Sequence, residues 1–196
     1  QKLRIKFCEW SNVAFLYDCP TESFYKNLYA NVYWESGKNT SIEAKRSNSV
    51  GRLSRVNRAL RRSSLNLPDQ PNVLEIGCGN GFTVSRFSQK NQGCAFGIEP
   101  SDTAIEMCEN IGVRILGNSI DDLANNKIKI NCVLMIHVLE HLIDPHESLK
   151  KLGQFIATGT ILLLEVPDLE TGSDISLRHP FAYTIRGLFL LLNRCG

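Results

Sequence analysis

The segment that most constrains the fold is a short apolar run that passes directly into three glycines at alternate positions. It reads Val73-Leu74-Glu75-Ile76-Gly77-Cys78-Gly79-Asn80-Gly81-Phe82. A buried strand followed by such a loop and a helix is typical of the first βα unit of a nucleotide-binding sheet, because glycine permits positive φ and lets backbone approach a ligand closely. A tight turn that binds nothing would explain neither Glu75 nor the acidic residue Glu99 that follows.

After this unit, short apolar runs alternate with stretches of helical pattern. Residues 72–76, 94–99, 113–116, 132–136 and 160–166 are expected to be strands. Ser101 and Asp144 are placed to cap the helices that follow, and Pro145 suits a first helical position. Strands alternating with helices predict an α/β, Rossmann-like open parallel sheet with helices on both faces and strand order 3-2-1-4-5.

The first 67 residues have a different character. They hold 12 basic and 5 acidic side chains, whereas residues 68–196 hold 10 and 15. Apolar residues at 24, 28 and 32, and at 50, 53, 56 and 60, predict two amphipathic helices. Arginines 52, 55, 58, 61 and 62 lie on the other side of the second helix, as a solvated face or as a phosphate site. We therefore expect an N-terminal helical cap over residues 1–67 and a cofactor-binding domain over residues 68–196.

Charge and cysteine usage predict partners and compartment. The formal net charge is +2, so neither nucleic acid nor a membrane is expected as a partner. No apolar run approaches the length of a bilayer span, and no signal peptide is visible. Seven cysteines without a C-x-x-C spacing indicate reduced thiols in a cytoplasmic protein, and Cys8 and Cys19 are expected to be packed thiols rather than half of a zinc site. Because the chain stops at Gly196, strands 6 and 7 of the usual sheet are expected to be missing.

The glycine spacing and one acidic residue, Glu75, favour one cofactor over another. A dinucleotide fingerprint needs glycine where this chain has Phe82. The Glu75 carboxylate would repel a pyrophosphate, whereas it matches the ammonium and sulfonium charges of S-adenosylmethionine. Glu99 can accept hydrogen bonds from the ribose hydroxyls, a feature that NAD enzymes share. An NAD(P)-binding oxidoreductase domain therefore stays open as the alternative, as does a cofactor-binding module without catalysis.

From Val73 to about Gly196 the chain resembles class I S-adenosylmethionine-dependent methyltransferases, in the broad group of quinone-biosynthesis and sugar methyltransferases. The matching segments are VLEIGCGNGF, GIEPS, LGNSIDDL, CVLMIHVLEHLIDP and ILLLEVPDL, in that order. The resemblance implies that Glu75 and the glycine loop hold the methionine part of the cofactor, that Glu99 holds the ribose, and that Ser119 and Ile120 flank the adenine. Where many relatives place Asp beside the adenine amino group, this sequence offers Asn118 or Asp121. The expected cofactor-binding set is Glu75, Gly77, Cys78, Gly79, Gly81, Phe82, Glu99, Pro100, Ser119, Ile120 and His137.

The segment from His137 to His141 also spells H-x-x-E-H, an inverted zinc-protease signature. That site needs a long helix, whereas here the residues follow a buried strand, so a protease is excluded. The resemblance implies that this loop borders both cofactor and acceptor. Glu140 and His141 match a segment that in some relatives binds a divalent metal and in others supplies a histidine base. In the alternative interpretation, the two side chains only hold the loop against the next helix. We expect no metal, since metal-binding relatives usually have Glu where this chain has His137.

The chemistry expected is O-methylation of a small hydroxylated acceptor, glycosyl or otherwise cyclic. A hydroxyl acceptor must lose its proton, and His141 is the candidate base, with Asp168 as its carboxylate partner. His179 is a second candidate for lining the acceptor site. The aromatic N-terminal residues and the loop over residues 168–183 are expected to close over the cofactor. The aromatic set is Phe24, Tyr25, Tyr29, Tyr33 and Trp34.

Overall fold

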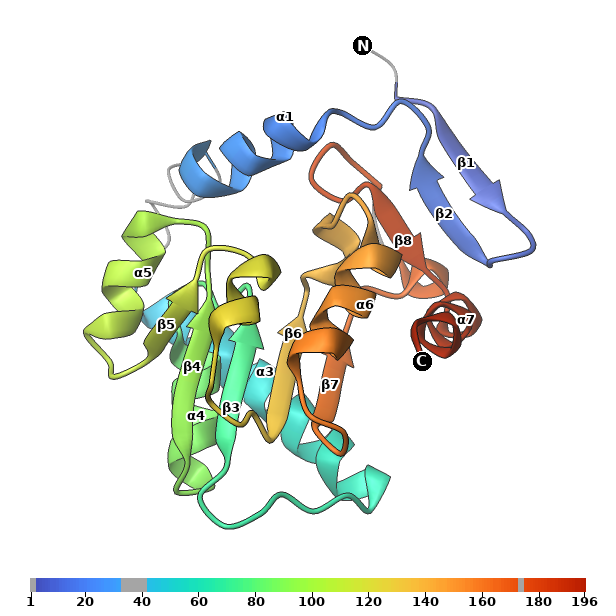
Figure 1. Ribbon diagram of the computed structural model, residues 1–196. Helices are drawn as coiled ribbons and strands as arrows, with labels where there is room; N and C mark the ends of the chain where they lie inside the picture. The colour runs from blue at the N-terminus through green and yellow to red at the C-terminus, as the bar shows by residue number, and fades with distance from the viewer. Residues whose placement is uncertain (1–2, 33–41, 173–174) are drawn as a thin grey trace.

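A computed structural model describes residues 3–32, 42–172 and 175–196 of the chain (Figure 1). Five parallel strands form its central sheet: β3 (Asn72–Ile76), β4 (Cys94–Ile98), β5 (Arg114–Gly117), β6 (Cys132–Ile136) and β7 (Ile161–Glu165). They lie in the spatial order β5-β4-β3-β6-β7, which is 3-2-1-4-5 when the strands of this sheet are counted along the chain. The predicted α/β class with a parallel sheet of five strands is confirmed.

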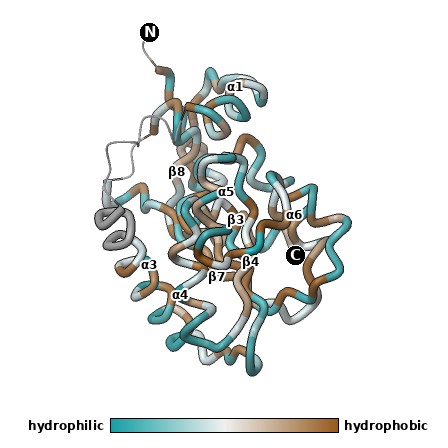
Figure 2. The backbone as a smooth tube through the Cα atoms, turned by 90° about the vertical axis from the view of Figure 1, so that its left-hand side faces the viewer, coloured by the Kyte–Doolittle hydropathy of each residue, from teal (hydrophilic) through white to brown (hydrophobic). Residues whose placement is uncertain are grey.

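Helices cover both faces of this sheet. Helices α3 (Ile42–Ser63) and α4 (Phe82–Lys90) lie on one side and α6 (Pro145–Phe155) on the other (Figure 2), while α5 (Asp102–Glu109) follows β4. The predicted start of α6 is confirmed, because the Asp144 side chain accepts a hydrogen bond from the Glu147 N–H at 2.9 Å and proline occupies the first turn. Within the described ranges, no helix is both long and apolar enough to cross a membrane.

Three further strands, which the sequence analysis did not predict, build a second sheet. β1 (Ile5–Cys8), β2 (Val13–Leu16) and β8 (Phe181–Tyr183) pair in antiparallel fashion in the order β1-β2-β8, and α7 (Ile185–Cys195) follows. The expectation that strands end with the fifth was therefore wrong, as was a purely helical N-terminal segment. The apolar runs are short, and their pairing joins residues far apart in the chain, as when Thr184 Oγ1 donates to the Asn12 carbonyl oxygen at 3.0 Å.

The remaining N-terminal residues form the expected helix in two parts, α1 (Glu22–Asn27) and a π-helical turn η1 (Leu28–Val32). This segment passes over the carboxyl ends of the central strands (Figure 1). The expected contributions of Tyr33 and Trp34 fall outside the described residues. Of the two N-terminal cysteines predicted to be packed, Cys19 is exposed, so that prediction was wrong for it.

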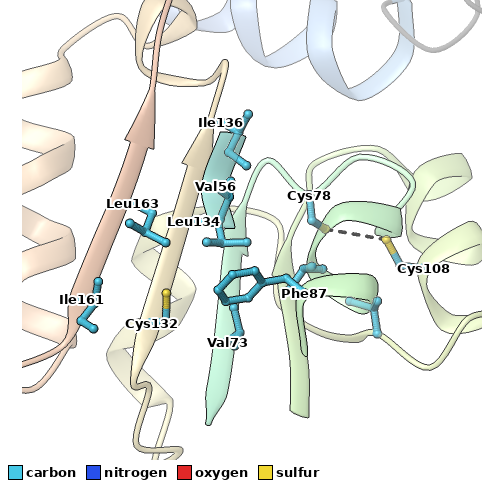
Figure 3. Packing of buried hydrophobic residues seen from close by; sticks show 12 residues of the cluster. Val56, Val73, Cys78, Phe87, Cys108, Cys132, Leu134, Ile136, Ile161 and Leu163 are labelled. Atoms are coloured by element: carbon cyan, nitrogen blue, oxygen red, sulfur yellow. Dashed lines mark hydrogen bonds between the residues drawn. The ribbon is translucent and has the colours of Figure 1, made fainter. Parts of the chain in front are cut away.

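The core divides into two layers, one on each face of the sheet. Along β6, Cys132, Leu134 and Ile136 point to the layer that α3 and α4 cover (Figure 3), and Val133 and Met135 point to the layer that α6 covers. Successive residues of a strand face opposite sides, so a strand that is apolar throughout must be buried on both. Residues 132–136 of β6 are all buried. This packing fixes the carboxyl ends of the central strands, where the loops of interest begin.

Candidate active site

A cleft of about 1410 Å³ lies along the carboxyl ends of the central strands. Eight of the eleven residues expected to bind cofactor line it, and so does His141. The eight are Gly77, Cys78, Gly79, Glu99, Pro100, Ser119, Ile120 and His137. Glu75, Gly81, Phe82 and Asp168 do not line it. The position agrees with the general rule that open α/β sheets bind ligands outside the carboxyl ends of their strands.

The glycine loop after β3 requires glycine for two physical reasons. Gly77, Gly79 and Gly81 all have positive φ, between 57° and 72°. At Gly77 an added Cβ would also lie 2.7 Å from Val138 Cγ2, inside van der Waals contact. The loop therefore passes against the segment after β6 at a distance that only glycine allows.

Glu99, the residue directly after β4, holds the glycine loop in place through hydrogen bonds. Its Oε2 accepts a hydrogen bond from the Gly79 N–H at 2.8 Å, and its Oε1 accepts one from the Ser101 N–H at 3.1 Å. The side chain is 4% exposed, and a carboxylate that accepts backbone N–H groups is held in one orientation. Glu99 therefore joins the loop to the start of α5 at the floor of the cleft.

Glu75 lies behind the loop rather than in the cleft. Its Oε2 accepts a hydrogen bond from the Val84 N–H in the first turn of α4 at 3.1 Å. Burial raises the pKa of this carboxyl to about 8, because the charged form loses its hydration. The structure therefore places the predicted acidic residue one layer below the cleft, where it supports the helix that begins at Phe82.

The segment after β5 forms the wall of the cleft where adenine is expected to bind. Ser119 and Ile120 line the cleft with Asn118 and Asp121. Asp121 forms an ion pair with Lys151 Nζ at 2.8 Å. The neighbouring Asp122 accepts hydrogen bonds from the Asn118 and Ser119 N–H groups at 2.7 and 2.9 Å, which fixes this turn.

His137 lies between two carboxylates. Its Nδ1 is 3.2 Å from Glu140 Oε1 and its Nε2 is 2.9 Å from Glu165 Oε1. Hydrogen bonds to Glu140 and then Glu165 raise the pKa of His137 to about 9, so the imidazole is charged at neutral pH. Its φ of 54° is in the left-handed region, an uncommon conformation for histidine that the surrounding contacts must hold.

The carboxylate on the outer side of His137 was missed by the sequence analysis. Glu165 ends β7 and accepts two hydrogen bonds from Arg55 of α3, both at 2.8 Å. Burial raises the pKa of Glu165, but hydrogen bonds from His137 and Arg55 outweigh it and lower that pKa to about 2. The expected parallel pairing of these two strands was the signal that could have found Glu165. Ile136 at the end of β6 pairs with Glu165 at the end of β7, and this places Glu165 beside His137.

Nδ1 of His141 has two hydrogen-bonding neighbours. Its Nδ1 lies 2.7 Å from the Arg178 carbonyl oxygen and 2.8 Å from Tyr29 Oη, while Nε2 lies 3.9 Å from Glu140 Oε1. The His179 ring packs edge-on against it with centroids 4.6 Å apart. Burial lowers the pKa of His141, so the ring is neutral at neutral pH.

The structure does not bring Asp168 to His141, as the sequence analysis expected. Asp168 caps a short helical turn, η4 (Leu169–Thr171), and accepts a hydrogen bond from the Glu170 N–H at 3.2 Å. A residue just past a strand often turns into such a cap instead of pointing along the strand. Glu140 is the carboxylate that approaches His141, and among the described residues its Oε2 is the buried side-chain oxygen without a hydrogen-bond partner.

The described residues hold no group of three or more His, Cys, Asp or Glu side chains that could bind a metal ion. His137 and His141 approach the same carboxylate, but each already uses ring nitrogens in the contacts given above. The site is therefore built on histidine–carboxylate and histidine–carbonyl contacts.

Comparison with known proteins decides the family. A family model described as a methyltransferase domain matches residues 50–189. The chain belongs to this methyltransferase family. The predicted resemblance to class I S-adenosylmethionine-dependent methyltransferases is confirmed, and the nicotinamide alternative is set aside.

Solved methyltransferase structures share the fold. The chain superposes on a SAM-dependent methyltransferase from Archaeoglobus fulgidus with a TM-score of 0.63 and 19% identity, over 85% of this chain and 74% of the other. For magnesium protoporphyrin IX methyltransferase from Synechocystis PCC 6803 with bound SAH, the values are 0.61 and 14%, over 90% and 89% of the chains. At these identities the likeness concerns the fold alone.

Curated relatives correct one expectation. The tRNA U34 carboxymethyltransferase of Campylobacter fetus subsp. fetus (strain 82-40) is 26% identical over 146 residues, 67% of this chain and 51% of that protein. The enzyme of the same name from Dichelobacter nodosus (strain VCS1703A) is 33% identical over 101 residues, 47% of this chain and 31% of that protein. The chain thus spans about half the length of the first of these relatives.

These names overturn the exclusion of nucleic acid as a partner, because the relatives are named for a tRNA nucleotide. The exclusion used the net charge of +2, which averages a basic N-terminal part with an acidic remainder. Net charge carries no information about a local patch of one sign.

Proposed function

We propose that this chain is the catalytic domain of an S-adenosylmethionine-dependent transferase that alkylates a hydroxyl group of an RNA nucleoside. The observation that carries the proposal is that one cleft contains both the glycine loop and a neutral histidine with a defined basic nitrogen. We also propose that the chain divides into an N-terminal segment, residues 1–67, and a cofactor domain, residues 68–196. The proposed location is the cytoplasm.

The residues present fit the cofactor. A carboxylate oxygen can accept two hydrogen bonds, so Glu99 can hold the loop through Gly79 and also bind ribose hydroxyls. Gly77 and Gly79 bring backbone to the cleft without a side chain, which leaves room for the methionine part. The cleft exceeds the roughly 300–1,000 Å³ of an ordinary ligand pocket, which leaves space for an acceptor beside the cofactor.

The proposed base is Nε2 of His141. A carbonyl oxygen only accepts, so the 2.7 Å contact with Arg178 requires that Nδ1 carries the proton. Nε2 of the neutral ring then has the lone pair, and it takes the proton from the acceptor hydroxyl as the oxygen attacks. The cofactor supplies the methyl group on a sulfonium, a good leaving group. Glu140 Oε1, 3.9 Å from Nε2, stabilises the imidazolium that results.

The proposed acceptor class is supported by the relatives and by aromatic residues that line the cleft. The relatives are named for transfer to uridine 34 of tRNA. Tyr29 lines the cleft and stacks on the buried Tyr25, with an interplanar angle of 18° and centroids 6.1 Å apart. Tyrosine rings are common stacking partners for unpaired RNA bases.

A small hydroxylated acceptor, glycosyl or otherwise cyclic, is the second candidate. One contact favours it: Tyr29 Oη donates a hydrogen bond to the Arg178 carbonyl oxygen at 2.7 Å, and both residues line the cleft. A contact between two lining segments restricts the space beside His141, which suits a small molecule more than a polynucleotide.

The deciding experiment measures transfer of labelled methyl groups from S-adenosylmethionine to tRNA, and in parallel to a panel of hydroxylated sugars and phenols. Because the relatives transfer a carboxymethyl group, a second arm uses S-adenosylmethionine carboxylated on its methyl carbon. Label in RNA supports the proposal, and label only in a small molecule supports the second candidate. A protein that binds adenosylhomocysteine but labels neither class overturns both.

A further inference from the structure

The outer face of α3 carries the most one-sided charge of the chain. Between Ala44 and Pro68 there are seven Lys and Arg side chains and no Asp or Glu. Arg55, Arg58, Arg61 and Arg62 are exposed. Residues 55, 58 and 62 follow at intervals of three and four, so they share one face of the helix. Opposite them, Val56 is buried in the core with Leu53 and Leu60 against it, which anchors the helix.

Most of these arginines are not neutralised by acids. Arg55 is paired with Glu165. In the part of the chain that the structure describes, Arg58, Arg61 and Arg62 have no ion-pair partner. Clustered guanidinium groups repel one another, so a row of three without carboxylates lowers stability unless an anion is present. The planar guanidinium group of arginine can donate two parallel hydrogen bonds to the oxygens of one phosphate.

The helix connects the active-site cleft to a second hollow. Ser49 and Arg52 line the cleft near one end of the described side chains of α3. Near the other end, Arg61 lines a hollow of about 730 Å³, with Ser64, Asn66 and Gln92 as neutral polar neighbours and Asp69 as the acid. From Arg52 to Arg62 the helix rises roughly 15 Å. Helix α3 lies along α4 on one face of the sheet (Figure 2), and Arg58, Arg61 and Arg62 are exposed along this length.

We propose that Arg58, Arg61 and Arg62 form a phosphate-binding ridge that holds the backbone of the RNA acceptor while its target nucleoside enters the cleft. This inference rests on the proposed function and adds a surface outside the cleft to it. An RNA strand fits the ridge because three exposed guanidinium groups lie within about one turn of the helix, where adjacent phosphates of one strand can reach them, and because the adjoining hollow offers amide and hydroxyl groups for sugars and bases.

The test uses the triple variant Arg58→Gln, Arg61→Gln and Arg62→Gln of the full chain with fluorescein-labelled tRNA. A matched control replaces three exposed cations elsewhere, Arg114, Lys127 and Lys129, by glutamine, so that both variants change the net charge equally. Binding is measured by fluorescence anisotropy over a range of salt concentrations. Adenosylhomocysteine affinity and melting temperature are measured on both variants.

The ridge variant is expected to bind tRNA at least tenfold more weakly at about 0.1 M salt, and its log–log salt slope to fall by about 2, since each lost phosphate contact removes about 0.7. Adenosylhomocysteine affinity and folding should not change, and the control should keep the wild-type slope. If the wild type binds tRNA and the two variants behave alike, the ridge is overturned and the proposed function stands. If the wild type does not bind tRNA, or binds anionic vesicles instead, both are overturned.

Discussion

The Nδ1 atom of His141 lies 2.7 Å from the carbonyl oxygen of Arg178, a residue 37 positions later in the sequence. Two lone pairs at this separation would repel, so the contact fixes the proton on Nδ1 and leaves Nε2 as the basic nitrogen. Orientation of a histidine by a hydrogen bond to its other nitrogen is a common way to prepare a general base. Here the backbone supplies that contact, where the sequence analysis expected the side chain of Asp168.

Replacement of His141 by glutamine tests the base directly. Glutamine keeps polarity and approximate size but has no basic nitrogen, so turnover should fall on the order of a hundredfold. Affinity for adenosylhomocysteine should not change, since the proposed role begins only with the acceptor. The same substitution at His146, which does not line the cleft, is the control. Turnover equal to wild type would return His141 to a purely structural role.

Replacement of Glu75 by glutamine should raise stability and lower cofactor affinity. The pKa of about 8 means that the unfolded chain ionises this group from about pH 4.5, whereas the folded chain resists ionisation until pH 8. Stability conferred by the protonated carboxyl is therefore lost as pH rises through this window. Glutamine can still accept from Val84 without that penalty, so we expect a gain on the order of 1–3 kcal/mol at pH 8.5 and little change at pH 4.5.

The measurements are thermal unfolding at the two pH values and calorimetric titration with adenosylhomocysteine. A buried acid kept at a cost to stability indicates a functional requirement, so the variant should bind the cofactor product at least threefold more weakly. Equal melting temperatures at both pH values would contradict the burial argument, and equal affinity would contradict the functional one.

The charged His137 should make stability depend on pH between 6.5 and 9. Below pH 6.5 the ring is protonated in both folded and unfolded chains, and its contacts with Glu140 and Glu165 contribute fully. As pH rises towards the folded-state pKa of about 9, only the folded chain keeps the proton, and the contribution is lost.

Asparagine at position 137 tolerates the left-handed backbone but cannot be protonated. Urea unfolding should therefore show this variant less stable than wild type by about 1–2 kcal/mol at pH 6, a value reduced for the partial exposure of the ring. The difference should shrink above pH 9. A difference that stays constant over this range would show that His137 is neutral in the folded protein.

Alanine at Gly77 should be more damaging than alanine at Gly112. Both glycines have positive φ, 63° and 79°, so both substitutions carry a conformational cost of about 1 kcal/mol. Only at Gly77 does the new Cβ meet a neighbour, Val138 Cγ2 at 2.7 Å, whereas nothing lies within 4 Å of it at Gly112. We expect a further loss of about 1–3 kcal/mol and weaker adenosylhomocysteine binding for Gly77→Ala alone. Equal unfolding midpoints for the two variants would contradict a close approach of these loops.

The sequence by itself determined the elements whose signals are local. The run from Val73 to Phe82 specifies strand, loop and helix within ten neighbouring residues, and both the strand and the positive φ values of its glycines follow the prediction. Asp144 and Pro145 likewise mark the start of α6. Apolar periodicity also predicted α3, because its apolar residues repeat at the helical period.

Only the tertiary structure decided which side chains meet in the cleft. Arg55 and Glu165 are 110 residues apart, and Tyr29 and His141 are 112 apart. Neither contact has a local signal, because each depends on how the elements pack. The second sheet was invisible for the same reason: β8 is a strand of three residues whose partner lies near the start of the chain. Short strands owe their stability to neighbours in space, whereas the glycine loop and the helix caps satisfy their own backbone within a few residues.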